Sequence, residues 1–111
     1  MAALASAADP WRARFYCRTE FKGGAIVDDR GSASKGCTNI PDCNPPNGVG
    51  ARSMQFENNP PPTCAITVFT GAGCTGTSKA YTGTTNVADF SAVSPPGAPV
   101  RSYRVDCPPL P

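Results

Sequence analysis

The sequence predicts an all-β domain, a two-sheet sandwich stapled by disulfides, and three observations lead to this fold class. Thirteen prolines and eleven glycines gather in clusters such as 41-PDCNPPNGVG-50 and 59-NPPP-62. Clusters of this kind do not fit inside helices or central strands. Short runs rich in β-branched and aromatic residues lie between the clusters, and no amphipathic helix is evident. Six cysteines in a chain of 111 residues indicate a fold held by disulfides.

Five runs have the composition of β-strands and are bounded by turn-forming residues. Trp11, the only tryptophan, precedes the first run, and we expect it to cap the core rather than to lie exposed as a ligand platform. The length suits one domain, which we expect over residues 13–107, between an N-terminal tail (1–12) and a C-terminal tail (108–111). The five runs are 13-ARFYCR-18, 51-ARSMQFE-57, 65-AITVFT-70, 78-SKAYT-82 and 99-PVRSYRV-105.

An internal repeat divides this domain into two motifs. Three segments of the first half recur in the same order in the second half, and the differences in length fall in loops. The linker 59-NPPP-62 lies between the copies, so we expect motif one over residues 13–57 and motif two over 64–107. The aligned segments are FYCRTEFKG (15–23) with VFTGAGCTG (68–76), TNIPD (38–42) with TNVAD (85–89), and RSMQF (52–56) with RSYRV (101–105).

The repeated pattern resembles the Greek-key motif of the βγ-crystallin superfamily. That motif has an aromatic residue, four residues, a second aromatic, one residue and glycine, followed later by Ser-apolar-x-apolar. FYCRTEFKG matches its first part, and VFTGAGCTG matches with Cys74 in place of the second aromatic. Ser53 and Ser102 open the two closing segments. The resemblance covers nearly the whole chain and implies two Greek-key motifs packed as a two-sheet β-sandwich.

The resemblance also implies structural roles for the residues of the opening motif. Gly23 permits a backbone conformation that is closed to residues with a Cβ. The aromatic Phe21 packs on the resulting turn, and the serine of the closing strand anchors that turn by hydrogen bonding. We therefore interpret Tyr16, Phe21 and Gly23 as architecture, with direct use in binding as the alternative.

Many microbial members of the superfamily bind calcium through an N/D-N/D-x-x-S/T-S run that ends at the serine of the closing strand. In this chain Arg52 and Arg101 precede those serines, and a cation at a ligand position repels Ca²⁺. The run 28-DDRGSA-33, with Asp28, Asp29 and Ser32, fits the pattern superficially but comes too early. We interpret it as a solvated loop between the second and third strands, with a calcium site as the alternative, and expect neither metal nor cofactor.

The resemblance also bears on the pairing of the cysteines, which sequence alone does not fix. The first and fourth strands of a crystallin motif are antiparallel neighbours, which implies a disulfide between Cys64 and Cys107. Two further pairs are hypotheses, in which one disulfide braces the TNIPD turn and the other takes the cysteines that remain. These pairs are Cys37–Cys43 and Cys17–Cys74.

Composition excludes several classes of function. There is no histidine, which removes Ser-His, Cys-His and His-metal mechanisms and, with the cysteine spacing, argues against zinc. Eight acidic residues could include a glycosidase pair, but their spacing selects none, so we expect no enzyme. A net charge of +2 is too small to indicate nucleic-acid binding. No apolar run reaches the roughly 20 residues of a membrane span.

Four cations crowd the start of the domain and are the predicted binding residues: Arg12, Arg14, Arg18 and Lys22. Arg12 and Arg14 share one face of a strand because side chains alternate with a period of two. The cluster could contact an anionic lipid or cell-wall polymer. The alternative is an ordinary solvated sheet edge protected by charge.

The opening MAALASAADP looks like the end of a removed signal peptide, so we expect secretion. The resembling family includes small secreted toxins and antifungal proteins. We expect a monomeric, non-enzymatic toxin, antifungal or effector protein that binds a cell-surface or cell-wall component, or a host or competitor protein. The alternative is a secreted proteinase inhibitor that presents the loop 43-CNPPNGVG-50. A third possibility is a structural extracellular protein.

Overall fold

The computed structural model describes residues 11–43, 50–58, 63–93 and 95–108. Four features of the sequence analysis therefore lie outside the described residues. They are the remnant of a signal peptide (1–10), the interior of the proline-bounded loop (44–49), the linker 59–62 and the end of the C-terminal tail (109–111).

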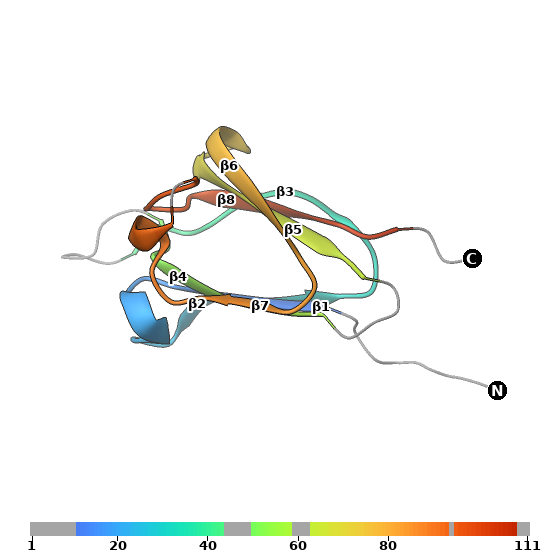
Figure 1. Cartoon of the computed structure of the whole chain (residues 1–111), viewed down its shortest axis with the longest axis horizontal. Coiled ribbons are helices and arrows are strands. Elements are labelled where there is room, and N and C mark those ends of the chain that lie inside the picture. The colour runs from blue at the N-terminus through green and yellow to red at the C-terminus, as the bar shows by residue number, and fades with distance from the viewer. Residues whose placement is uncertain (1–10, 44–49, 59–62, 94, 109–111) are drawn as a thin grey trace.

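Within these described residues, eight strands form two antiparallel four-stranded sheets. The sheets pack face to face, as Figure 1 shows. One sheet has the order β2-β1-β4-β7 and the other the order β3-β8-β5-β6. The predicted all-β sandwich with disulfides is confirmed. The elements are β1 (Trp11–Tyr16), β2 (Ala25–Gly31), β3 (Lys35–Asn39), β4 (Ser53–Asn58), β5 (Ala65–Gly71), β6 (Thr75–Thr82), β7 (Thr85–Val87) and β8 (Ser102–Asp106), with the 3₁₀ turns η2 (Thr19–Phe21) and η3 (Phe90–Ala92).

The two halves of the chain have the same topology. Each half places its first, second and fourth strands in one sheet and exchanges its third strand, β3 or β7, into the other sheet. The first and fourth strands pair in each half, β1 with β4 and β5 with β8, as a Greek-key connection requires. The outer edges of the sandwich are therefore formed by β2 beside β3 and, on the opposite side, by β6 beside β7.

The strand registers support the repeat and correct one part of its alignment. Tyr16 pairs with Ser53 and Phe69 pairs with Ser102, which agrees with the alignment of the opening and closing segments. The middle alignment of TNIPD with TNVAD is wrong by two residues. Thr38 pairs with Tyr103 of β8, and Val87 pairs with Met54 of β4. Tyr103 and Met54 hold equivalent positions in the repeat, so Thr38 corresponds to Val87 rather than to Thr85. The Thr-Asn match misled because sheet register is set by which side chain faces the core.

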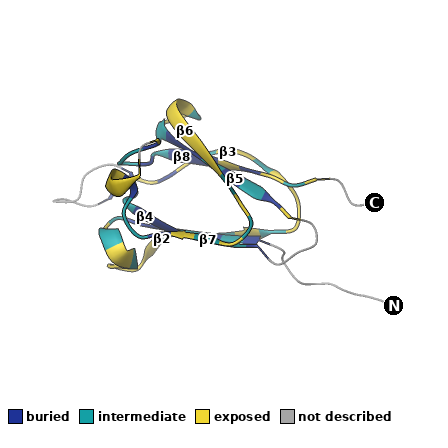
Figure 2. Cartoon of the chain, in the orientation of Figure 1, coloured by how far each residue is buried: buried dark blue, intermediate teal, exposed yellow. Residues whose placement is uncertain are grey.

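The core lies between the two sheets and is built mainly from alternate residues of β1, β4, β5 and β8 (Figure 2). In β1 the side chains of Trp11, Ala13 and Phe15 are buried. The rings of Phe15 and Tyr103 lie 4.9 Å apart between centroids and join the two sheets. Trp11 is only 2% exposed, and its indole Nε1 donates to the carbonyl oxygen of Ala33 at 2.9 Å. The expectation that Trp11 caps the core is confirmed.

A buried serine anchors the first hairpin of each half. Ser53 Oγ accepts a hydrogen bond from the backbone N–H of Phe21 at 3.1 Å and donates to the carbonyl oxygen of Arg18 at 2.5 Å. Ser102 Oγ makes the equivalent bonds, accepting from the N–H of Cys74 at 2.9 Å and donating to a carbonyl of the β5–β6 turn at 2.5 Å. Phe21 and Cys74 both have positive φ, 60° and 57°. The anchoring role expected of both serines is therefore confirmed.

All six cysteines are paired in three disulfides. The expected bond between Cys64 and Cys107 is present and joins the start of β5 to the end of β8. The other two expected pairs are wrong. The exchange of β3 into the second sheet carries Cys37 to the β5–β6 turn and leaves the following segment beside the end of β1. The observed pairs are Cys17–Cys43 and Cys37–Cys74.

Three strands are not among the five runs that composition marked: β2, β3 and β7. Residues 28–31 of the DDRGSA run belong to β2 and are not a solvated loop. These strands lie at sheet edges and have few fully buried side chains, so they lack the apolar alternation that marks a strand. The acids of β2 are instead bonded to side chains of β1 and β3, as the next section describes.

Candidate functional site

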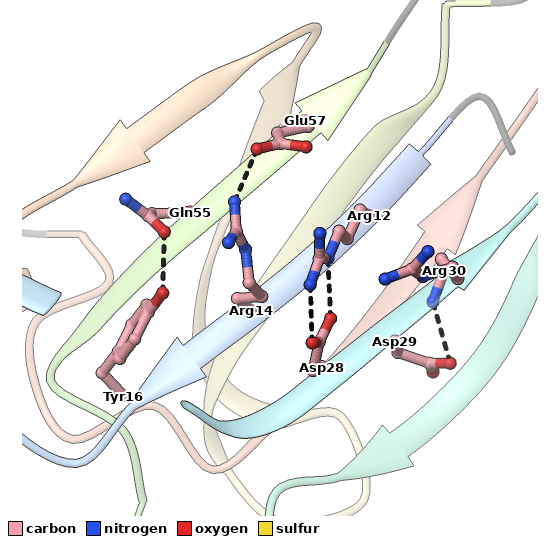
Figure 3. Close-up of polar contacts among 8 residues, drawn as sticks. All are labelled: Arg12, Arg14, Tyr16, Asp28, Asp29, Arg30, Gln55 and Glu57. Carbon is pink, nitrogen blue, oxygen red and sulfur yellow. Dashed lines mark hydrogen bonds and ion pairs between the residues drawn. The ribbon is translucent and has the colours of Figure 1, made fainter. Parts of the chain in front are cut away.

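The predicted binding residues Arg12 and Arg14 lie side by side on the outer face of β1, as expected, but both are in ion pairs (Figure 3). The Arg12 guanidinium donates from Nε and Nη2 to the two carboxylate oxygens of Asp28, at 2.8 and 2.7 Å. Arg14 Nη2 lies 2.5 Å from Glu57 Oε2. The hydrogen bond from Arg12 lowers the pKa of Asp28 and raises the pKa of Arg12. Half of the expected positive patch is therefore neutralised by acids of β2 and β4.

Arg18 and Lys22 form the other half of the cluster and differ in their surroundings. Both are exposed and flank η2. Neither has an ion pair among the described residues. The structure thus divides the predicted cluster into a structural pair and an exposed pair. Sequence reasoning missed Asp28 and Glu57 as partners because they come from neighbouring strands.

The two adjacent acids of β2 point to opposite faces of the sheet. Asp28 bonds Arg12 on the outer face, whereas Asp29 pairs with Lys35 and accepts a hydrogen bond from the Tyr103 hydroxyl at 3.0 Å. This geometry does not allow both carboxylates to ligate one ion. No group of three histidine, cysteine or acidic residues suited to a metal occurs within the ranges that the structure describes.

A cleft of about 570 Å³ opens on the side of the sandwich where β6 lies beside β7. Its lining comes from Tyr81 of β6, the three residues of β7, Glu20 of η2, and four residues in and around η3, which are Ala88, Asp89, Ala92 and Val93. In Figure 1 the two 3₁₀ turns lie at the same end of the sandwich, one beside each layer. A backbone bond from the N–H of Glu20 to the carbonyl oxygen of Ala88, at 2.7 Å, ties η2 to the strand end.

The wall of this cleft is largely apolar and holds one orphaned polar group. Val87, Ala88, Ala92 and Val93 supply aliphatic surface. Val93 is 38% exposed and is the exposed large hydrophobic residue of the described chain. The hydroxyl of Tyr81 is buried without a hydrogen-bond partner, and burial raises the pKa of that side chain. Buried polar groups of this kind are uncommon because each costs free energy.

The carboxylate of Glu20 is carried on a backbone conformation that favours glycine. Glu20 has φ 61° and ψ 28°. Its counterpart in the second half is Gly73, with φ 68°, whose N–H donates to Asn39 Oδ1 at 2.8 Å. A residue with a Cβ costs about 1–2 kcal/mol in this region. The first half therefore keeps an acid where the second half has the unstrained residue.

The opposite side of the sandwich explains why the cleft is open. Asp29 of β2 and Tyr81 of β6 occupy corresponding positions, each opposite a buried residue of the neighbouring first strand. On the β2–β3 side, the ion pair of Asp29 with Lys35 and the Tyr103 hydroxyl close the gap between the sheets. On the β6–β7 side, Thr85 stands where Lys35 would be, and the Tyr81 hydroxyl is left unpaired.

Two acids that are distant in the sequence meet at this cleft, Glu20 and Asp89. Asp89 Oδ1 accepts hydrogen bonds from the N–H and the hydroxyl of Ser91, at 2.9 and 2.6 Å, and so fixes the start of η3. Sequence reasoning gave no reason to pair these acids. The one available signal was the repeat, which aligns Glu20 with a glycine.

Comparison with known proteins does not assign this chain to a family. No protein-family model matches the chain, and the search of curated proteins found no match. Within the described residues, no helix is long and apolar enough to span a membrane. The function of the chain is therefore proposed from its own fold and surfaces.

Proposed function

We propose that this chain is a small secreted, non-enzymatic protein that acts by binding outside the cell, as a toxin, antifungal or effector protein does. The observation that carries the proposal is the complete pairing of six cysteines in one small domain. Disulfides persist in oxidising, extracellular surroundings and are rare elsewhere. The membership of the βγ-crystallin superfamily is part of the proposal and is supported by the matching topologies and serine anchors of the two halves.

The disulfides contribute a large share of the stability. The sequence separations of the bonded cysteines are 26, 37 and 43 residues. Closing loops of this length stabilises a folded chain by about 3.5–4 kcal/mol each. Small domains have a total free energy of unfolding of about 5–15 kcal/mol. A small domain held by three disulfides suits a protein that must persist after secretion.

The exposed pair Arg18 and Lys22 is the proposed contact with an anionic cell-surface or cell-wall component. Arg12 and Arg14 are less suited because their charges are already matched by Asp28 and Glu57. The same ion pairs support a non-enzymatic role, since they hold these two acids in structural bonds.

The test applies the oxidised protein to microbial cultures and to plant leaves and measures growth inhibition and tissue response. The variant carries Arg18→Glu and Lys22→Glu, and a control with Arg30→Glu and Arg104→Glu has the same net charge. We expect activity to fall in the first variant and to weaken with salt, because screening shortens to about 3 Å at 1 M. Full activity of the first variant would contradict contact through these residues. Inactivity of the wild-type protein on every cell type would contradict the proposed function.

A proteinase inhibitor is the second candidate, and the ends of the segment 43–50 favour it. Cys43 is bonded to Cys17, and its Sγ lies 3.0 Å from the carbonyl oxygen of Gly50. Ala51 exchanges two backbone hydrogen bonds with Val100, at 2.7 and 2.8 Å. The ends of the segment are thus held together, as preorganised binding requires. Nanomolar inhibition in a panel of proteinases, with cleavage mapped to this segment, would replace the first proposal.

A further inference from the structure

We propose that the cleft between β6 and β7 binds a small aliphatic amine, with the ammonium group at Glu20 and Asp89 and the alkyl chain on the apolar wall. The inference goes beyond the proposed function, because it names a ligand class for a second site. It concerns a different surface from Arg18 and Lys22.

The charge of the cleft selects a cation. Glu20 and Asp89 are the charged residues that line it, and no lysine or arginine is found among the described lining residues. Asp89 uses one oxygen, Oδ1, in its bonds to Ser91. Lys79 lies nearby, with its Nζ 6.0 Å from the centroid of the Tyr81 ring, but does not line the cleft. Two carboxylates that line the same cleft together attract an ammonium ion more strongly than a single acid does.

The remaining walls suit an aliphatic chain that carries the cation. Val87, Ala92 and the exposed Val93 offer apolar surface, and Tyr81 lines the cleft beside them. The volume of about 570 Å³ lies within the range of small-molecule sites, roughly 300–1,000 Å³. A small amine therefore fits the cleft in charge, polarity and size.

The asymmetry between the two halves indicates that the cleft is more than a packing defect. Glu20 keeps a left-handed conformation where the second half has Gly73, and Tyr81 keeps an unpaired hydroxyl where the first half has a bonded Asp29. Both features cost stability in the free protein and both lie at the same cleft. A bound ammonium would interact with the carboxylate of Glu20.

The test is an NMR titration of the ¹⁵N-labelled oxidised protein with n-butylammonium chloride, using n-butanol as a neutral analogue of similar shape. We expect saturable amide shifts confined to Glu20 and residues 81–93, and binding of n-butanol weaker by at least about tenfold. Glu20→Gln should weaken n-butylammonium binding by about tenfold, since the negative charge that attracts the ammonium is lost while an acceptor oxygen remains. Asp106→Asn, an exposed acid on the outer face of β8, should bind like the wild type.

Three results would overturn the inference: no shifts in the cleft, shifts spread over the whole surface, or equal binding of n-butanol. A lysine-containing peptide that bound more than about tenfold tighter than n-butylammonium would replace the small amine by the side chain of a partner protein. The titration contains no cells, so the two proposals fail separately. A negative titration by a protein that is active on cells removes only the cleft ligand, and normal titration by a protein inactive on cells removes only the proposed function.

Discussion

Replacing Tyr81 with phenylalanine should stabilise the free protein. The substitution removes one oxygen and keeps the ring that packs against the core. The hydroxyl of Tyr81 is buried and has no hydrogen-bond partner, so the folded state loses its hydration without compensation. In the unfolded chain the same hydroxyl is bonded to water. Removing it therefore favours folding.

The expected size follows from the cost of an unsatisfied group. A buried donor or acceptor left without a partner costs about 1–3 kcal/mol. The Tyr81 side chain as a whole is only partly buried, so the lower end of this range, about 1 kcal/mol, applies. For a domain of this size, 1 kcal/mol corresponds to a rise in Tm of roughly 4 °C or more.

Tyr103→Phe is the matched control. The Tyr103 hydroxyl donates to Asp29 Oδ2 at 3.0 Å, so the same chemical change removes a bond and should lower the Tm. Both variants and the wild type are compared by thermal unfolding at neutral pH with all disulfides intact. A fall in Tm of Tyr81→Phe as large as that of Tyr103→Phe would refute the reasoning, because it would mean that the Tyr81 hydroxyl has a partner in solution.

Gly76→Ala should lower the free energy of unfolding more than Gly23→Ala, as measured by urea unfolding. Both glycines have positive φ, but a Cβ added at Gly76 would lie 3.0 Å from a backbone atom, whereas one added at Gly23 would meet only an arginine side chain. Equal losses of unfolding free energy in the two variants would contradict this prediction. Millimolar Ca²⁺ should leave the Tm unchanged, because Asp28 is paired with Arg12; a rise abolished by Asp28→Ala would show a real site. Burial raises the pKa of Tyr103 above its ordinary 10.0. The contribution of the neutral Tyr103 side chain to stability is therefore present below pH 10 and is lost as the pH rises through the raised pKa. Urea midpoints should therefore fall above pH 10, and less so in Tyr103→Phe; an equal fall in both would exclude this tyrosine as the cause.

The sequence alone determined the fold class, the presence of disulfides and the internal duplication. These features are local: turn residues, strand composition and cysteine number act over a few neighbouring positions. The serine anchors followed from the resemblance, because each serine bonds the hairpin of its own half. The bond between Cys64 and Cys107 also joins strands of one half, which pair directly.

The contacts between strands and between the two halves of the chain were decided only by the tertiary structure. The exchange of β3 and β7 between the sheets set the pairing of Cys37 with Cys74, which sequence reasoning missed. The packing of neighbouring strands supplied the acids that neutralise Arg12 and Arg14. The cleft brings Glu20 together with Tyr81 and Asp89. Such contacts join residues that are remote in the chain, and they depend on register and on the approach of two sheets, which no local pattern of residues encodes.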